Sequence, residues 1–236
     1  MIYAGTCLYI DNTDTEEIRK TAIKLKEIGV DKFRCKIFGG GSTPEKYYDG
    51  MGYDGISELL AINEFIPVGT EIHTPDQLLR CRGLNYLWIG ARNSANYSLL
   101  KETNRHKGDI LIKRGMTMSV EETKGIYDIM VKIHKKEPYI IERGVAGIHR
   151  NENKWHIDLN SLIDIKNNHP EMFKRIIVDC SHSCFNKNYI KDIYQATRSI
   201  GIKHFMFECT YSGKSRTDQE HMLSVDELRI ILDKKL

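Results

Sequence analysis

The sequence predicts an α/β fold, a single (β/α)8 TIM barrel that occupies residues 1–236. Two observations predict it: eight short runs of apolar or β-branched residues recur along the chain, and each is followed by a segment with helical spacing or a helix-start signal. Short, nearly continuous apolar runs are typical of strands buried on both faces, and strands that alternate with helices form parallel sheets. The short connections favour the closed barrel over a doubly wound open sheet, which is the structural alternative.

The expected strands contain the runs IYAGTC, KFRCKIF, IPVGTEI, YLWIGA, DILIKR, YIIERG, RIIVDC and HFMFEC, which begin at residues 2, 32, 66, 86, 109, 139, 175 and 204. The expected helices lie within residues 14–29, 53–63, 74–81, 93–102, 119–135, 158–165, 189–201 and 224–234. Two of their ends carry signals: Gly29 stops the first helix, and Ser119 with Glu122 forms a capping-box pattern at the start of the fifth.

Composition excludes several classes of protein. The chain has 236 residues, 41% of them hydrophobic and 28% charged, and its net charge of +3 comes from dispersed Lys and Arg, so no nucleic-acid surface is expected. No apolar run approaches the roughly 18 residues of a membrane span, and we expect a cytoplasmic protein.

Six cysteines without a CxxC pair favour free thiols or metal ligands over disulfides. Uniform composition without a linker predicts one domain and no regulatory domain.

Charged or metal-binding residues recur at the ends of the expected strands, where the active site of such a barrel lies. In chain order they are Cys7, Arg34, Lys36, Glu71, His73, Arg92, Lys113, Arg114, Glu142, Arg143, Asp179, His182 and Glu208. A charge at this position is costly unless it is paired or liganded. The repetition therefore predicts a polar site above the barrel floor.

One subset of these residues suits a metal. Barrel closure brings the first, seventh and eighth strands together, so Cys7, His182 and Glu208 converge, and Asp218 on the following loop can reach them. This mixed sulfur, nitrogen and oxygen set suits Mn, Fe, Co or Zn. The alternative for His182 is a hydrogen-bonded core histidine. Its neighbouring cysteines, Cys180 and Cys184, are interpreted as packing residues or as contacts of the ligands.

A second subset is cationic and consists of Arg34, Arg92, Lys113 and Arg143. Several arginines together indicate a small anion that carries both carboxylate and phosphate. The alternative is a set of ion pairs with Glu71, Glu142 and Asp179, which leaves an excess of cations. The glycine-rich segment FGGGSTP lacks the spacing of a phosphate-binding loop.

The motifs IGARN, LIKRGM, IIERG, IDLNSL, VDCSHS and LSVDEL occur in the order of the landmarks of type I 3-deoxy-D-arabino-heptulosonate 7-phosphate (DAHP) synthases. The chain resembles the short form of that family, whose barrel is shared by 3-deoxy-D-manno-octulosonate 8-phosphate synthases. The resemblance implies a metal-dependent, aldolase-like transferase of aromatic amino acid biosynthesis. Such an enzyme condenses phosphoenolpyruvate (PEP) with an aldose phosphate, and a homo-oligomer, dimer or tetramer, is also implied.

Matched position by position, the resemblance implies the metal ligands Cys7, His182, Glu208 and Asp218 and the PEP-binding cations Arg34, Arg92, Lys113 and Arg143. Proton transfer is assigned to Lys113 and Glu71. Lys36 shares the inward parity of Arg34 and is a candidate replacement for a family lysine that this chain lacks.

The departures from the family concern the aldehyde acceptor. Where the family has Lys-Pro-Arg-Thr, which holds the phosphate end of the aldehyde, residues 39–42 read Gly-Gly-Gly-Ser. Several cations could replace the lost charge: Lys36, the weaker candidate Lys46, and the loop cations Lys187, Lys214 and Arg216.

Other departures lie elsewhere in the chain. Thr6 and Cys180 stand where the family has proline, and FECT lacks the usual histidine. The acceptor therefore stays open, and a protein that binds PEP and metal without catalysis is the alternative function.

Overall fold

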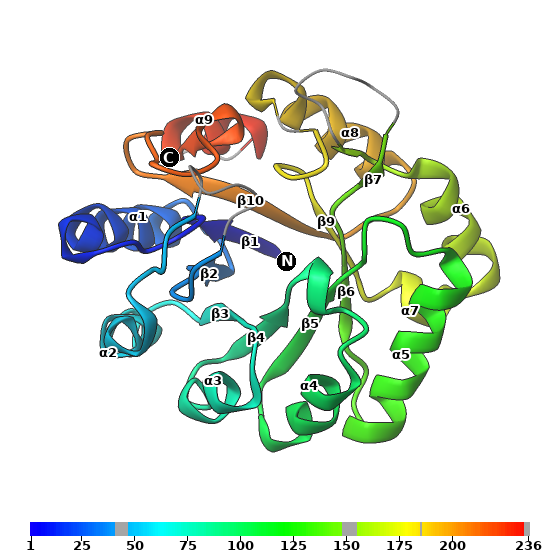
Figure 1. Cartoon of the computed structure of the whole chain (residues 1–236). Coiled ribbons are helices and arrows are strands. Elements are labelled where there is room, and N and C mark those ends of the chain that lie inside the picture. Colours follow the sequence, from blue (N-terminus) through cyan, green and yellow to red (C-terminus); the bar gives the residue numbers. More distant parts are fainter. Residues whose placement is uncertain (41–46, 148–154, 185, 234–236) are drawn as a thin grey trace.

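Eight parallel strands close into a barrel in the computed structural model, which describes residues 1–40, 47–147, 155–184 and 186–233 (Figure 1). The first and last strands of the barrel pair with each other, with Ile2 opposite Phe205 and Gly5 opposite Glu208. This pairing confirms the closed barrel and excludes the open sheet. The strands are β1 (Ile2–Gly5), β2 (Lys32–Arg34), β3 (Val68–Ile72), β4 (Tyr86–Ile89), β5 (Asp109–Lys113), β6 (Tyr139–Glu142), β9 (Ile176–Asp179) and β10 (His204–Thr210).

Helices form the outer layer around the strands (Figure 1). A helix begins in each of the eight segments where the sequence predicts one, the sixth runs three residues further than expected, to Asn168, and a one-turn helix follows it. They are α1 (Thr15–Glu27), α2 (Ile56–Asn63), α3 (Pro75–Arg80), α4 (Tyr97–Glu102), α5 (Val120–His134), α6 (Leu159–Asn168), α7 (Pro170–Phe173), α8 (Ile190–Ser199) and α9 (Val225–Ile231).

The predicted helix signals act as expected. Ser119 Oγ accepts a hydrogen bond from Glu122 N at the start of α5, and Glu122 Oε2 accepts one from Ser119 N, so the capping box is complete. Gly29, just beyond α1, has φ of 71°, a left-handed conformation that glycine adopts without steric cost.

Two small elements were not predicted. An antiparallel pair, β7 (Val145–Ala146) with β8 (Trp155–His156), follows β6, and β11 (Leu223–Ser224) pairs with the end of β10. Strands of two residues leave no periodic pattern to read. Both elements lie beyond the carboxyl ends of barrel strands, so they shape the rim of the site.

The core has two parts. Apolar side chains pack between the strands and the helices, and a second cluster fills the inside of the barrel. The inner cluster is rich in aromatic rings and contains Tyr3, Tyr86, Trp88, Leu111, Tyr139, Ile141, Ile177 and Met206. Because alternate strand residues face the same side, Glu208 follows Met206 inward, one layer higher. Polar groups therefore collect above a packed floor, at the carboxyl ends of the strands.

All six cysteines are free, as the sequence predicts. Cys180 and Cys184 are buried in the apolar core, which confirms their interpretation as packing residues. Among the described residues, no helix combines the length and the apolar character that crossing a membrane requires.

Candidate active site

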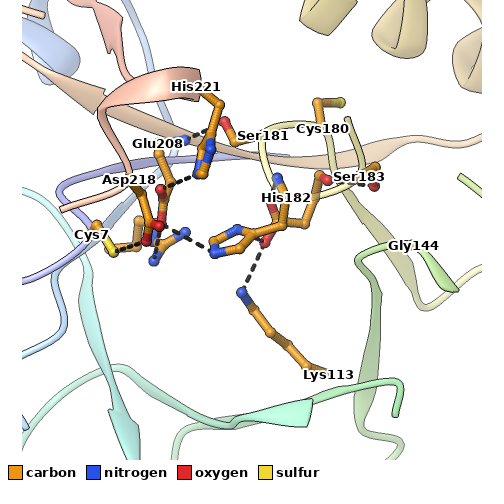
Figure 2. A network of polar contacts seen from close by, with 12 residues as sticks. Cys7, Lys113, Gly144, Cys180, Ser181, His182, Ser183, Glu208, Asp218 and His221 are labelled. Atoms are coloured by element: carbon orange, nitrogen blue, oxygen red, sulfur yellow. Dashed lines mark hydrogen bonds and ion pairs between the residues drawn. The ribbon is translucent and has the colours of Figure 1, made fainter. Parts of the chain in front are cut away.

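Among the described residues, four side chains of types that can bind a metal converge beyond the carboxyl ends of β9 and β10. His182, Glu208, Asp218 and His221 each offer a ligand atom, and these atoms all lie within 4.8 Å of one another. Three of the four were predicted from the sequence, and His221 was not. Figure 2 shows the group with Cys7 at its edge.

Glu208 lies at the centre of this group and is fully buried. One carboxylate oxygen, Oε1, is 3.0 Å from Arg34 Nη2 and 3.6 Å from His182 Nε2, and the other, Oε2, is 2.7 Å from His221 Nε2. Burial on its own raises the pKa of Glu208, but His182, Arg34 and His221 outweigh burial and lower it. Glu208 is therefore a carboxylate, the form that binds a metal.

His182 follows β9 in a turn that Asp179 organises. Asp179 Oδ1 accepts a hydrogen bond from His182 N, and Asp179 Oδ2 lies 2.9 Å from His182 Nδ1. With Nδ1 held by a carboxylate, Nε2 faces Glu208, which is the arrangement that orients metal-binding histidines in proteins. Burial lowers the pKa of His182, which favours the neutral imidazole that a metal requires.

Cys7 reaches the group through Asp218. Its Sγ donates a hydrogen bond to Asp218 Oδ2 at 3.0 Å (Figure 2). Burial, together with the nearby Glu208 and Asp218 carboxylates, raises the pKa of the Cys7 thiol. A bound cation would reverse this effect, since a thiol that coordinates a metal loses its proton. The donors present thus fit a divalent transition metal.

The predicted cations surround the same site. Lys113 Nζ lies 2.9 Å from Asp179 Oδ2, Arg34 pairs with Glu208, and Arg143 lies over the ring of Trp155, 4.6 Å from its centroid. Arg92 is exposed on the short turn that follows β4. The ion-pair alternative predicted that Asp179 and Glu142 would pair with these cations. Asp179 does so, whereas Glu142 pairs with Arg114 and Glu208 takes its place.

Two buried arginines retain donors that no described residue satisfies. Within the described part of the chain, Nε and Nη1 of Arg34 and Nη1 of Arg143 are buried without a hydrogen-bond partner. An unsatisfied buried guanidinium donor is costly, so such groups indicate an anionic ligand. Burial lowers the pKa of Arg143, and repulsion from Arg92 adds to the effect. An anion bound between the two arginines would counter both the burial and the repulsion.

Glu71 forms a separate polar cluster beside the cations. Trp88 Nε1 donates a hydrogen bond to Glu71 Oε2, and Lys36 Nζ and His73 Nε2 lie 3.9 and 4.0 Å from its carboxylate. Burial opposes ionisation of Glu71, but Lys36, His73 and Lys113 lower its pKa to about 2. Lys36 therefore faces the site, as its strand parity predicts.

Arg114 and Glu142, two of the charged residues at the ends of the expected strands, form a structural network. Arg114 Nη1 lies 2.8 Å from Glu142 Oε2 and 3.2 Å from Asp158 Oδ2, and its other nitrogens donate to Met118 O. This buried network joins the ends of β5 and β6 to the start of α6. Its residues alternate with Lys113 and Arg143 along the strands, so the strand pleat separates them from the substrate-facing side.

The glycine-rich loop lies partly outside the described residues, as do Gly41, Ser42 and Lys46. Within the described part, a Cβ added to Gly39 would collide with the carbonyl oxygen of Tyr48, and one added to Gly40 would lie 3.3 Å from Lys36 Nζ. Gly39 stands where the resemblance to the family leads us to expect a lysine. The backbone path therefore leaves no space for a side chain there.

The proposed replacement cations from later loops are largely paired. Arg216 lies 2.8 Å from Asp11 and 2.7 Å from Asp14, and Lys187 lies 2.9 Å from Glu227. Lys214 is exposed, and the ion pairs between described residues do not include it.

His221 was missed because the interpretation stopped at Asp218. The signal that could have found it is its spacing, three residues after Asp218, since side chains three residues apart in a helical turn lie on the same face. Asp218 is the N-cap of one 3-10 turn, Gln219–His221, and His221 is its last residue.

Fold and site together define a (β/α)8-barrel protein in which a group of His, Asp and Glu side chains that could hold a metal ion lies beside a cluster of cationic side chains. The chain belongs to the DAHP synthetase I family, whose model matches residues 1–234. Phospho-2-dehydro-3-deoxyheptonate aldolase of Thermotoga maritima is 25% identical over 210 residues, which are 88% of this chain and 60% of the relative. This chain thus spans less than two thirds of that relative's length.

Two solved structures from Thermotoga maritima share the fold. A crystal structure of phospho-2-dehydro-3-deoxyheptonate aldolase (DAHP synthase) superposes with a TM-score of 0.85 at 22% identity, over 99% of this chain and 66% of the other. A truncated form of 3-deoxy-D-arabino-heptulosonate 7-phosphate synthase gives a TM-score of 0.83 at 21% identity, over 99% and 84% of the two chains.

Proposed function

We propose that this protein condenses PEP with an aldehyde, an aldose or aldose phosphate, to a 3-deoxy-2-ulosonate and releases phosphate. Membership of the DAHP synthetase I family supports this activity. The observation that carries it is the position of unsatisfied, buried Arg34 and Arg143 donors at the same barrel end as the His182, Glu208 and Asp218 donors. A site of this kind suits an anion held beside a cation.

The cations would bind PEP. Arg34, Arg92 and Arg143 would share its carboxylate and phosphate, and Lys113 would lie beside them as a point charge. These cations are preorganised, because Arg34 is fixed by Glu208 and Lys113 by Asp179 before any ligand arrives. PEP should therefore bind without the aldehyde.

Cys7, His182, Glu208 and Asp218 would hold the divalent ion, Mn, Fe, Co or Zn. Such an ion supplies a Lewis acid for the aldehyde oxygen. The residues themselves set its place, since Asp179 orients His182 and Arg34 fixes Glu208.

In the reaction, C3 of PEP forms the new bond to the aldehyde carbon, water adds at C2, and the C2–phosphate oxygen bond breaks. The products are one ulosonate and one inorganic phosphate, so water is the only other reactant. We assign proton exchange to Lys113 and Glu71, with Lys36 holding Glu71 ionised.

The residues available to bind the acceptor differ from those that the family resemblance implies. The backbone at Gly39 excludes a side chain, and Arg216 and Lys187 are held by carboxylates. These observations favour an acceptor other than erythrose 4-phosphate, used in a specialised pathway, over the aromatic pathway of the family. Assembly into a dimer or tetramer stays a prediction.

Phosphate release tests the proposal. The metal-loaded protein is incubated with PEP and, in turn, erythrose 4-phosphate, other aldose phosphates and unphosphorylated aldoses. Aldehyde-dependent phosphate release with any of them supports the synthase. PEP binding and metal binding without release from any acceptor would instead favour the protein that binds without catalysis.

A further inference from the structure

We infer that His221 is an additional ligand of the metal site, so that two imidazoles, from His182 and His221, act with the Glu208 and Asp218 carboxylates. This inference rests on the proposed metal site and adds a residue to it. Its basis is the group of four whose ligand atoms lie within 4.8 Å of one another. Cys7 is outside that group and contacts it through Asp218.

The geometry around Glu208 suits a shared ion. His221 Nε2 lies 2.7 Å from Glu208 Oε2, and the His221 and His182 rings are 5.2 Å apart between centroids. With bonds of about 2.1 Å, two adjacent ligand atoms of one octahedral or tetrahedral ion lie roughly 3.0 to 3.4 Å apart. The His221–Glu208 contact is already near that separation, so an ion could replace the shared proton after a small shift.

The backbone holds His221 in place. Asp218 has φ of 53°, a left-handed conformation unusual for a residue other than glycine, and it begins the 3-10 turn that ends at His221. Just after His221, β11 pairs with β10, which places Leu223 beside Cys209. Strained backbone of this kind persists where the surroundings fix it and is common at functional sites.

Burial gives a second reason. His221 is fully buried, and so is its partner Glu208. A buried imidazole needs partners for its polar atoms, and here the side chain is directed at the centre of the metal-binding group, not at the apolar core (Figure 2). An apolar residue here could not contact the Glu208 carboxylate, whereas an imidazole contacts it and can also bind a metal.

Cobalt binding tests the inference. The whole chain is titrated with Co²⁺ alone, and the affinity is measured by competition with a chelator for the parent and for His221→Gln, His221→Ala and His204→Gln. Glutamine keeps an N–H donor for Glu208 but is a poor ligand, so it separates coordination from simple positioning. His204 begins β10, at the opposite end of the barrel, and provides a matched histidine control on the strand that carries Glu208.

We expect both His221 variants to bind Co²⁺ at least about tenfold more weakly, and His204→Gln to match the parent. X-ray absorption of the Co²⁺-loaded parent should count two imidazoles, and His221→Gln one. One imidazole in the parent, or parent-like affinity and imidazole count in His221→Gln, would overturn the inference. Absence of Co²⁺ binding by the parent would refute the proposed metal site itself. The parent measurement decides the matter even where a variant does not fold.

Discussion

Lys113 Nζ lies 2.9 Å from Asp179 Oδ2, and both side chains are buried at the mouth of the barrel. The same carboxylate oxygen lies 2.9 Å from His182 Nδ1. One aspartate therefore connects the proposed PEP pocket with the proposed metal site. Burial raises the pKa of Asp179, but His182 and Lys113 outweigh burial and hold the pKa well below its usual value.

Asp179→Asn should weaken divalent metal binding by about 10–100-fold, the range for loss of a group that orients a ligand. The amide no longer provides the negative charge that holds the His182 ring, and Lys113 loses its counter-ion. Chelator competition measures the affinity, and Asp192→Asn, on the exposed side of α8, is the matched control. An unchanged affinity would show that Asp179 does not orient His182.

His182→Ala should remove stoichiometric divalent metal and leave the barrel folded. His182 lies in the turn after β9, above the packed interior, so its loss opens no cavity in the apolar core. Metal analysis gives the stoichiometry, and far-UV circular dichroism reports the fold. If the variant retains as much metal as the parent, the assignment of this site is wrong.

Arg92→Ala and Arg143→Ala should each weaken PEP binding by about 1.5–3 kcal/mol, the range for a hydrogen bond that involves a charged group. Calorimetry with PEP in the absence of aldehyde measures the effect. Arg105→Ala, an exposed arginine that follows α4, serves as the control. A parent protein that binds no PEP at millimolar concentration would remove PEP as the substrate.

Glu71 predicts a pH dependence of stability. Its pKa in the folded protein is about 2, below the ordinary value of 4.5, so its contribution is present above pH 4.5 and is lost as the pH falls toward 2. Between pH 5 and pH 3, the parent should lose on the order of 2 kcal/mol more free energy of unfolding than Glu71→Gln. Urea unfolding at the two pH values measures this difference.

The exposed Glu64, substituted by Gln, is the control for that experiment and should leave the pH dependence unchanged. Equal losses of stability in the parent and in Glu71→Gln would mean that Lys36 and His73 do not stabilise the Glu71 carboxylate.

The barrel could be predicted from the sequence because each buried strand has its own apolar run. Convergence of His182 with Glu208 then followed from the pairing of β9 with β10, and barrel closure, which pairs β1 with β10, added Cys7. The Arg34–Glu208 ion pair could not be predicted, because it depends on side-chain lengths and on the register of two strand pairs, β2 with β1 and β1 with β10. His221 depends on the left-handed backbone at Asp218, which no periodic pattern records.

The structure at the rim of the site could not be predicted from the sequence either. Trp155, which packs against Arg143, belongs to a hairpin with strands of two residues each. Its position depends on a tertiary contact and not on a local preference. The ion pairs of Arg216 and Lys187 could not be predicted either, because they join segments that are distant in the chain, such as Asp11 and Arg216. These pairs leave neither cation available to bind the acceptor.

Erythrose 4-phosphate should be a poor acceptor. A phosphate dianion that leaves water without new cationic partners costs several kcal/mol, roughly the energy of two charge-assisted hydrogen bonds. Gly39 cannot carry the family lysine, because its Cβ would meet Tyr48, and Arg216 is held between Asp11 and Asp14.

Steady-state kinetics with PEP saturating should therefore give a kcat/KM for erythrose 4-phosphate below about 10⁴ M⁻¹s⁻¹, the low end of the usual enzyme range. An aldehyde with a different far end should exceed it. Lys36→Met should reduce turnover of the preferred acceptor, since its ammonium lies beside Gly40 and Glu71. Lys214→Met, on the exposed loop after β10, is the comparison that reports whether this cation contributes instead. A kcat/KM for erythrose 4-phosphate at or above that value, lost in Lys214→Met, would show an ordinary DAHP synthase whose phosphate clamp has moved to another loop.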